Sequence, residues 1–589
     1  MNVDKPRIEF AKPGYNTFGN TTNNFFFKKR KDVRMVISTE KKKASIELPT
    51  TKPELKVSRY LLQQLEAWGV QRIYGVIGDA IFALLDEIAR QSVIQFVPCR
   101  HEEAAALMAS AESKLTGRLS VCMATSGPGM AKLLDGLADA AMDRTPVLAI
   151  TGQVPTSKLG TNEKQYIDQQ ALIHPIAEQT RVLTSAQALP KLLNELMVSS
   201  QVRGIVAHLS IPMDLYNHLV PGAITAYPKH LHQKLLTPME PIEEAARLLS
   251  ESKRPVLYIG KGVAQSQAEV KKLATSMNAA VITTMPAFSY YPNDDALFAG
   301  GLGQAGSEAS SILLRESDLL LILGATWWPE AYTPSTVTIV QVDRIPQQIG
   351  INHSVRLGVV GDLADVLPKL LSVLGSQPDR AAWREQVSRT TQQWKSQIEA
   401  EASQETTPMA PQRVMKIISD IVSEDAIISV DTGDHTLWFE RIFQTRKHEI
   451  LISGHWRTLG FALPSAIAAK LTQPQRQSIA IVGDGAAVQT MLELQTASHL
   501  GVAVTMIIID NGSYAMEKNR MEVGGMNPLG SNLVNPDFCK IAEACGAKAF
   551  LAENSDQLVA TLKQALSEAN RPTLIQVKTR AAMVPHTKP

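Results

Sequence analysis

Short apolar runs and amphipathic stretches alternate along most of the chain, starting near residue 57. Apolar residues at helical spacing predict helices, and short continuous apolar runs predict strands. In the first stretch the predicted helices are 57–67, 101–115 and 127–141, and the predicted strands are 72–76, 94–98, 119–124 and 147–151. Strands that alternate with helices across short Gly-rich turns indicate a parallel sheet with helices on both faces. The pattern therefore predicts an α/β fold.

The same alternation recurs in two further stretches of the sequence. A Pro-rich segment at 220–241 separates the first stretch from the second, and a polar helical segment at 380–411 leads into the third. At 589 residues the chain is also too long for a single hydrophobic core. We therefore expect three doubly wound parallel-sheet domains, at 54–220, 236–375 and 408–580.

Residues 1–53 show neither helical nor strand periodicity, and basic residues cluster at 28–31. We expect a flexible extension that covers the surface or a neighbouring subunit. An organellar transit peptide is the alternative, although the acidic residues of the segment argue against it. Met35 could equally serve as a start, so the sequence leaves the role of this segment open.

Composition excludes several classes of function. The net charge is +2, which gives no long-range field for a nucleic acid. Four scattered cysteines do not form the framework of a disulfide-rich protein or a zinc site, so we expect a reducing cytoplasm. No run of 18 apolar residues occurs, and we expect no membrane span.

Two polar side chains follow two neighbouring predicted strands within residues 480–513. Asp484 stands in the Gly-Asp-Gly turn after the first strand, and Asn511 follows the second strand after an amphipathic helix. The carboxyl ends of parallel strands lie side by side, so both residues can supply oxygens to a hard cation such as Mg2+. The glycines let the backbone approach a diphosphate that the same cation neutralises.

This pattern resembles the diphosphate-binding motif of thiamine diphosphate (ThDP) enzymes. Residues 57–577 as a whole look like the pyruvate oxidase and acetolactate synthase branch of that family, with pyrimidine-binding, central and diphosphate-binding domains in this order. The resemblance implies three metal ligands, Asp484, Asn511 and Ser513. It also implies cofactor contacts from Gly483, Gly485, Ala486 and Tyr514.

Glu102 follows Arg100-His101 at the end of a predicted strand and opens an Ala-rich helix. Taken alone, a Glu at this place is favourable charge at a helix N-terminus. In the family, a Glu directly after Arg-His hydrogen-bonds N1′ of the aminopyrimidine and favours the tautomer that activates the cofactor. The resemblance therefore implies that Glu102 is catalytic. We expect Glu103 to be a solvated or ion-paired neighbour.

Leu459 matches the bulky apolar residue that bends the bound cofactor in the family; an ordinary core leucine is the alternative. The resemblance implies further cofactor contacts in two groups: at the diphosphate, Asp431, Gly433, Asp434 and His435, and near the pyrimidine, Gly78, Ser126 and Gln153. In the family the catalytic Glu and the Gly-Asp-Gly turn come from different subunits. The resemblance therefore implies a homodimer or homotetramer with active sites at the subunit interface.

The reaction implied is ThDP- and Mg2+-dependent decarboxylation of a 2-oxo acid, with pyruvate as the first candidate. Oxidation or transfer of the hydroxyethyl intermediate would follow, as in a pyruvate oxidase. Two alternatives stay open: an acetolactate synthase-like carboligase or decarboxylase without a flavin redox role, and a catalytically silent binding protein with this fold.

FAD is a further cofactor that the sequence leaves open. Gly-rich turns at 260–262 and 301–304, and Asp343 after a later strand, resemble those of flavin-binding relatives. Such turns also occur in family members whose central domain is empty. Trp327-Trp328 could pack on a flavin or on a domain interface. Phe82 departs from the small polar residue that pyruvate oxidases carry, which puts electron transfer to flavin in doubt.

Overall fold

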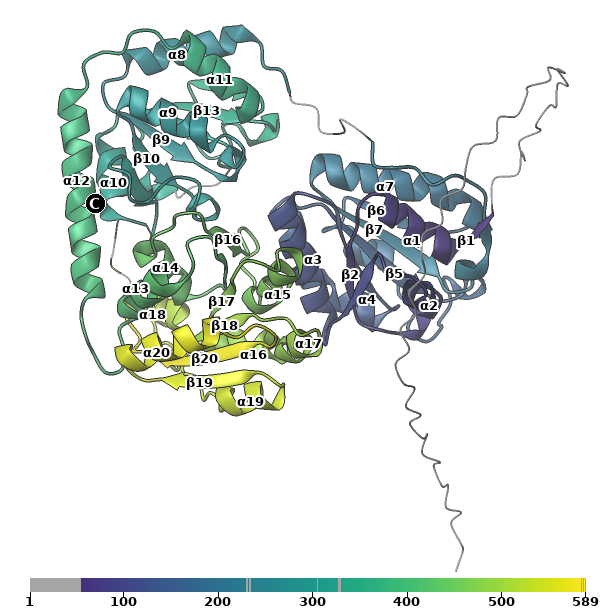
Figure 1. Ribbon diagram of the computed structural model, residues 1–589. Helices are drawn as coiled ribbons and strands as arrows, with labels where there is room; N and C mark the ends of the chain where they lie inside the picture. Colours follow the sequence, from purple (N-terminus) through teal and green to yellow (C-terminus); the bar gives the residue numbers. More distant parts are fainter. Residues whose placement is uncertain are drawn as a thin grey trace, which may run out of the picture. The chain divides into compact units, whose positions relative to one another are not determined.

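The structure is a computed structural model that describes residues 54–228, 231, 235–304, 306–326, 330–583, 585 and 587. The extension predicted at 1–53 and the pair Trp327-Trp328 lie outside the described residues. Three six-stranded sheets organise the described part, and neighbouring strands within each sheet run parallel (Figure 1).

The first sheet has the strand order β3-β2-β4-β5-β7-β6. Its strands are β2 (Arg72–Gly75), β3 (Gln95–Pro98), β4 (Ser120–Ala124), β5 (Val147–Gln153), β6 (Gln179–Val182) and β7 (Val206–Pro212). Its helices are α1 (Val57–Ala67), α2 (Phe82–Ala89), α3 (Glu102–Thr116), α4 (Pro128–Lys132), α5 (Leu134–Met142), α6 (Gln169–Ile173) and α7 (Leu189–Arg203). A short antiparallel pair joins β1 (Leu55–Lys56) to β8 (Leu219–Val220). The single helix predicted at 127–141 is divided at Leu133 into α4 and α5.

The second sheet has the order β11-β10-β9-β12-β13-β14. Its strands are β9 (Pro255–Ile259), β10 (Ala280–Thr283), β11 (Phe298–Gly301), β12 (Leu319–Leu323), β13 (Thr338–Asp343) and β14 (Leu357–Val360). The helices around it are α8 (Met239–Glu251), α9 (Gln267–Met277), α10 (Glu308–Glu316) and α11 (Leu363–Val373), and the long α12 (Ala381–Ala402) follows. Every residue of β12 is buried and apolar, as expected for a central strand that is covered on both faces.

The third sheet has the order β16-β15-β17-β18-β20-β19. Its strands are β15 (Ile427–Val430), β16 (Glu449–Ile452), β17 (Ser478–Gly483), β18 (Thr505–Asp510), β19 (Lys548–Ala552) and β20 (Thr573–Lys578). Its helices are α13 (Pro411–Ile421), α14 (Asp434–Ile442), α15 (Ala462–Thr472), α16 (Asp484–Thr490), α17 (Leu494–His499), α18 (Ala515–Val523), α19 (Phe538–Ala544) and α20 (Ser555–Leu566). The amphipathic helix predicted between β17 and β18 is thus α16 and α17, joined by a 3-10 turn at Met491–Glu493.

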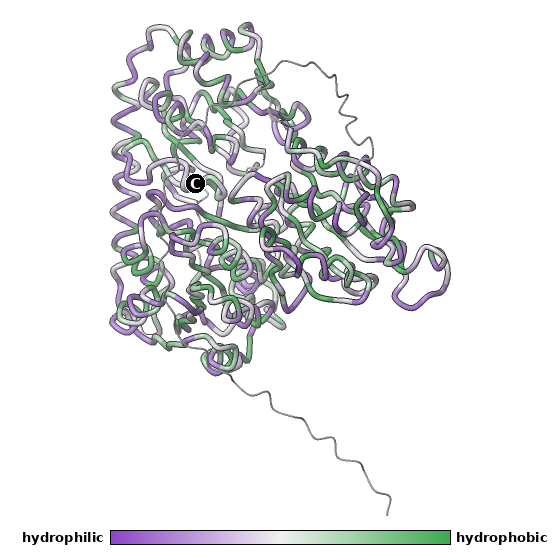
Figure 2. Tube along the Cα trace, turned by 45° about the vertical axis from the view of Figure 1, so that its right-hand side comes forward, coloured by the Kyte–Doolittle hydropathy of each residue, from purple (hydrophilic) through white to green (hydrophobic). Residues whose placement is uncertain are grey.

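Small residues bring the first and third sheets' helices together. Helix α3 packs against α15, and the buried alanines Ala105, Ala109, Ala462 and Ala466 belong to one core cluster (Figure 1). Alanine side chains let two helix backbones approach closely while still removing apolar surface from water. Figure 2 shows the hydrophobic stretches running along strands in the interior and hydrophilic ones along the outer helices.

The fold-class prediction is confirmed, because the described part contains three parallel α/β sheets. Their strands span residues 72–212, 255–360 and 427–578. The domain boundaries predicted around them stay predictions. Among the described helices, none is long and apolar enough to cross a membrane.

Candidate active site

Asp484 and the turn after Asn511 lie together at the carboxyl edge of the third sheet. Strands β17 and β18 pair in register, with Gly483 opposite Ile509, so the residues that follow them meet. Asp484 is only 2% exposed. Its Oδ1 accepts a hydrogen bond from its neighbour Gly485 N at 3.0 Å, and its Oδ2 accepts one from Gly512 N at 2.7 Å. The fold therefore joins the two ends of the predicted motif.

Asn511 reaches a second buried carboxylate. Its Nδ2 donates to Oδ2 of Asp434, the first residue of α14, at 3.3 Å, while its Oδ1 accepts from the N and Oγ of Ser513, each at 3.1 Å. Burial, and then the charge of Asp484, raises the pKa of Asp434 to about 6. Burial, with the neighbouring Asp510, likewise raises the pKa of Asp484 to about 6. A buried carboxyl group whose ionisation is disfavoured by a neighbouring buried carboxylate belongs to a site that a cation would stabilise.

The glycines of the motif make room for two rings. A Cβ at Gly483 would lie 2.8 Å from Nδ1 of His435, and a Cβ at Gly485 would lie 2.3 Å from Cε1 of Tyr514. Gly433 is under the same constraint from His435, at 2.5 Å. The resemblance implies that glycines here let a diphosphate approach, and in the structure a Cβ at each of these positions would also clash with a ring.

His435 has no hydrogen-bond partner at either ring nitrogen among the described residues, although both nitrogens are buried. Burial lowers its pKa to about 4, so the ring is neutral at pH 7. A neutral imidazole carries one N–H donor and one acceptor, and leaving them unpaired in the interior costs free energy. The orphaned ring beside Asp434 therefore points to a polar ligand at this edge of the sheet.

The carboxylate of Asp431 holds the backbone of the segment that carries Leu459. It accepts from the backbone N of Thr432, Gly460 and Ala462, each at 2.9 Å. Burial raises its pKa to about 7. The structure thus gives Asp431 a positioning role through the backbone around Leu459, whose side chain is partly buried against the core.

The residues predicted near the pyrimidine gather at the carboxyl ends of strands in the first sheet. Glu102 opens α3 and is buried, with Lys132 Nζ 4.0 Å from its Oε2. Gln153 ends β5, donates to Ile167 O at 3.1 Å and is also buried. Ser126 lies after β4 and is buried, and a Cβ at Gly78 would lie 2.4 Å from the Cβ of Thr125. Within the described ranges, no hydrogen bond or ion pair joins Glu102 to the motif around Asp484.

Two acidic residues beside the first sheet, Asp135 and Asp143, hold a loop that belongs to the third sheet. We call this contact, which the sequence did not reveal, the clamp. Asp135 on α5 accepts from Trp456 Nε1 and from Thr458 Oγ1, each at 2.6 Å. Asp143 accepts from the backbone N of Gly454 at 2.8 Å and of His455 at 2.9 Å. Because both acids lie on or just after an ordinary Ala-rich helix, no local pattern marks them as contacts of a loop more than 300 residues away.

This clamp holds a loop with an unfavourable backbone conformation. Arg457 has a φ of 59°, in the left-handed region that non-glycine residues rarely adopt. Such a residue costs on the order of 1–3 kcal/mol and persists only where its surroundings fix it. The hydrogen bonds from the residues on either side of Arg457 to Asp135 therefore define the approach to Leu459.

Glu103 is half-buried beside the clamp. Burial, followed by the charge of Asp135, raises its pKa to about 7, and its Oε2 lies 3.6 Å from Nδ1 of His101. When a carboxyl has a higher pKa in the folded than in the unfolded protein, the free energy of unfolding falls as the pH rises from the lower of these pKa values to the higher. Glu103 was expected to be solvated or ion-paired; the structure adds that it also lies beside a second acid, Asp135.

We expect Glu103→Gln to protect the protein at alkaline pH. From pH 5 to pH 8 the thermal midpoint of the wild type should fall relative to that of the variant, because only the wild type has an ionisable carboxyl at position 103. After solvent screening the difference should be about 1 kcal/mol, or roughly 2 °C. Parallel pH dependence of the two melting curves would contradict this assignment.

The comparisons with known proteins match this chain in three consecutive blocks. Residues 55–172 match the N-terminal TPP binding domain of thiamine pyrophosphate enzymes, 242–370 match their central domain, and 431–577 match their C-terminal TPP binding domain. The chain belongs to the thiamine pyrophosphate enzyme family. Thiamine pyrophosphate is ThDP under another name, so the predicted resemblance is confirmed.

Relatives of this ThDP enzyme cover nearly its full length. The thiamine pyrophosphate-containing protein YdaP of Bacillus subtilis is 33% identical over 520 residues, which cover 88% of this chain and 90% of that protein. A pyruvate oxidase of Lactiplantibacillus plantarum is 28% identical, covering 87% of each chain. The acetolactate synthase isozyme 1 large subunit of Escherichia coli is 28% identical, covering 91% and 96%. The protein is a ThDP-dependent enzyme of the pyruvate oxidase and acetolactate synthase branch.

The residues at the third sheet fit ThDP and a hard cation. Among the described residues, no group of three or more His, Cys, Asp or Glu could hold a metal ion. The edge at Asp484 instead offers carboxylate, amide, hydroxyl and backbone oxygens, which suit Mg2+ and not Zn2+. The ring N–H of His435, which has no partner among the described residues, can donate to a diphosphate oxygen. A ThDP enzyme could therefore hold its diphosphate and cation here.

The two glycine turns of the central unit are tightly packed, one by backbone and the other by a glutamate side chain. A Cβ at Gly260 would lie 2.3 Å from Gly324 O, and a Cβ at Gly301 would lie 2.1 Å from Oε1 of Glu440. Asp343 accepts from Ile345 N at 2.8 Å, and burial raises its pKa. These contacts account for the residue types at the turns, so the turns do not by themselves require a flavin.

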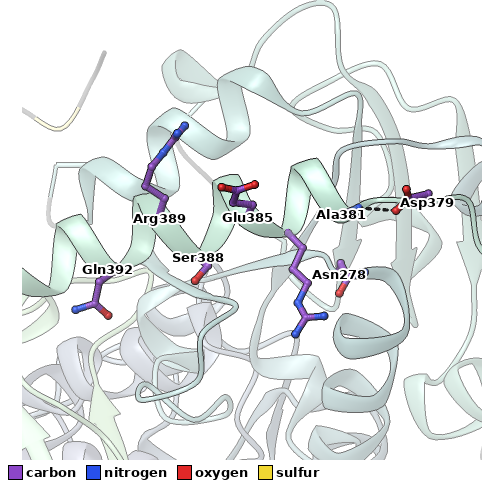
Figure 3. A pocket seen from close by; sticks show the side chains of 8 residues that line it. Asn278, Asp379, Ala381, Glu385, Ser388, Arg389 and Gln392 are labelled. Carbon is purple, nitrogen blue, oxygen red and sulfur yellow. Dashed lines mark hydrogen bonds between the residues drawn. The ribbon is translucent and has the colours of Figure 1, made fainter.

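A surface hollow on α12 lies apart from these residues (Figure 3). Polar and charged side chains line most of it, and Asp379 Oδ1 accepts from Ala381 N at 2.9 Å at its end. Its lining residues are Asn278, Asp379, Ala381, Arg384, Glu385, Ser388, Arg389 and Gln392. None of them belongs to the candidate active site.

Proposed function

We propose that this chain uses ThDP and Mg2+ to decarboxylate a 2-oxo acid, with pyruvate as the first candidate, and then oxidises or transfers the remaining two-carbon fragment. The observation that carries the proposal is the joining of Asp434, Asp484 and Asn511 at one sheet edge, beside the unpartnered ring of His435. The relatives named pyruvate oxidase and acetolactate synthase support both outcomes for the fragment.

In this proposal Asp484, Asn511 and Ser513 hold the cation. In the structure, Oδ1 of Asn511 accepts hydrogen bonds from the N and Oγ of Ser513. When the cation binds, this oxygen gives up those hydrogen bonds and contacts the cation instead. His435 donates its ring N–H to a diphosphate oxygen. Tyr514 and the glycines it packs against shape the floor beneath the diphosphate.

Glu102 would share a proton with N1′ of the aminopyrimidine. A buried carboxyl group at a helix N-terminus can exchange a proton over a short hydrogen bond, as general acid–base catalysis requires. Bound ThDP would supply the electron sink for the C–C bond electrons that the departing CO2 leaves behind. Leu459 gives apolar support, and the clamp at Asp135 and the carboxylate of Asp431 keep its segment in place.

We further propose that two copies of the chain complete each active site. Four apolar side chains that are close in sequence to the pyrimidine residues or to the diphosphate residues are strongly exposed in the single chain. They are Ile77 at 64%, Phe82 at 57%, Val488 at 47% and Leu492 at 58%. Ile77 adjoins Gly78, and Val488 and Leu492 follow Asp484 along α16 and the next turn. Covering these side chains with a second copy would bring a Glu102 to the diphosphate residues of its partner, in a homodimer or homotetramer.

Leu492→Glu should therefore shift the protein toward a monomer and lower its activity, because a charge at a buried interface is costly. Light scattering after size exclusion measures the mass, and pyruvate consumption measures the activity. Leu551→Glu is the matched control, since Leu551 is 45% exposed on the edge strand β19. Equal masses for the wild type and Leu492→Glu would remove this interface from the proposal.

The test of the function itself is CO2 release from pyruvate by the purified protein with ThDP and Mg2+. Acetolactate among the products would select the carboligase, whereas flavin absorbance of the protein and oxidised two-carbon products would select the oxidase. Absence of CO2 release from pyruvate and from other 2-oxo acids would contradict the proposal and favour the silent binding protein.

A further inference from the structure

A single side chain lies between two carboxylates at the carboxyl edge of the third sheet. Asn535 Nδ2 donates to Oδ2 of Asp484 at 2.7 Å and to Oδ1 of Asp510 at 2.9 Å. The sequence argument did not select Asn535, which lies 51 residues after Asp484. Its contact with the carboxylate of the proposed cation ligand calls for a physical explanation.

The loop that carries Asn535 is pinned to the turn of the motif. Leu533 N donates to Gly512 O, and Tyr514 N donates to Ser531 O, each at 2.8 Å. Ser513 also forms an isolated antiparallel bridge with Asn532. These bonds fix the backbone on both sides of the turn, so the amide of Asn535 is presented from a set position.

Asp510 is a second carboxylate, one strand end away from Asp484. Its Oδ2 accepts hydrogen bonds from Lys578 Nζ and Gln576 Nε2, each at 2.6 Å. Two carboxylates on neighbouring strand ends repel each other, and a shared donor between them offsets the repulsion. The amide of Asn535 takes this place.

The hydrogen bonds of Asp484 are unequal between its two oxygens. Oδ2 accepts from both Gly512 N and Asn535 Nδ2, whereas among the described residues Oδ1 accepts only from Gly485 N. A carboxylate oxygen with one donor keeps a lone pair for a cation. We propose that Asn535 is a positioning residue that fixes the Asp484 carboxylate with Oδ1 free for the cation and separates it from Asp510. This inference rests on the proposed cation site.

The test compares Asn535→Ala with the wild type in Mn2+ titrations followed by electron paramagnetic resonance, with ThDP saturating. The expected result is an affinity for Mn2+ that falls about 10-fold to 100-fold, as is usual when a partner of a metal ligand is removed. Saturating Mg2+ should restore kcat to within about 2-fold, because Asn535 orients a ligand and touches no reacting atom. Asn527→Ala, an exposed Asn on the same loop, should behave as the wild type.

Unchanged Mn2+ affinity in Asn535→Ala would overturn the inference. A loss of kcat that saturating Mg2+ does not restore would also overturn it, because that result assigns Asn535 to the structure of the loop. Asp484→Ala, measured alongside, distinguishes a failure of the proposed cation site from a failure of the role of Asn535. If Asp484→Ala also keeps the affinity of the wild type, the cation site of the proposed function fails; if only Asp484→Ala loses it, the role of Asn535 alone fails.

Discussion

Replacing Asp484 with alanine should lower the affinity for ThDP in the presence of Mg2+ by at least about 100-fold. The buried carboxylate of Asp484 accepts hydrogen bonds from Gly485, Gly512 and Asn535. Its removal takes away the anionic ligand of the proposed cation. Without the cation, the diphosphate would lie against Asp434 with no neutralising charge. Calorimetric titration of ThDP at saturating Mg2+ measures the effect.

The matched control for this variant is Asp420→Ala, because Asp420 is an exposed acid that pairs with Lys416 on the surface of α13. Its ThDP affinity should equal that of the wild type. Should Asp484→Ala bind ThDP as tightly as the control does, the cation would have to be held elsewhere, and the proposed site would be wrong.

Glu102→Gln should slow CO2 release from pyruvate by about 10²-fold to 10⁴-fold, the usual contribution of a positioned acid–base group. A glutamine fills the same space at the start of α3 but cannot share a proton with the aminopyrimidine. The affinity for ThDP should change little, because the diphosphate and cation are held by the third sheet. Stopped-flow detection of CO2 with saturating ThDP and Mg2+ separates the two quantities.

Glu103→Gln is the control next in sequence, since it makes the same chemical change one position away. It should keep most of the CO2 release while showing the altered pH dependence of stability described above. Equal rates for the wild type and Glu102→Gln would remove the proton-sharing role assigned to Glu102.

The parts of the site that the sequence predicted are those fixed by local patterns and by parallel topology. Asp484 and Asn511 could be paired because strands that follow one another through a βαβ unit end at the same edge of the sheet. Glu102 could be placed at a helix start from the Ala-rich stretch that follows it. For both, the distance along the chain is short or the connecting unit is regular.

The parts that the sequence missed depend on contacts without a local signal. Asn535 lies on an irregular loop, and Asp135 contacts Trp456 across 321 positions of the chain. The carboxylate of Asp431, which the resemblance places at the diphosphate, also accepts three backbone N–H groups that no local pattern indicates. Which way a loop carboxylate turns depends on tertiary packing, which residue type and spacing do not encode.

The most direct test of the central claim is a crystal structure of the protein with ThDP and Mn2+, with the cation located by its anomalous scattering. We predict a peak about 2.0–2.3 Å from Oδ1 of Asp484 and from Oδ1 of Asn511, in contact with the diphosphate. A cation bound away from both oxygens, or a diphosphate bound away from His435, would contradict it.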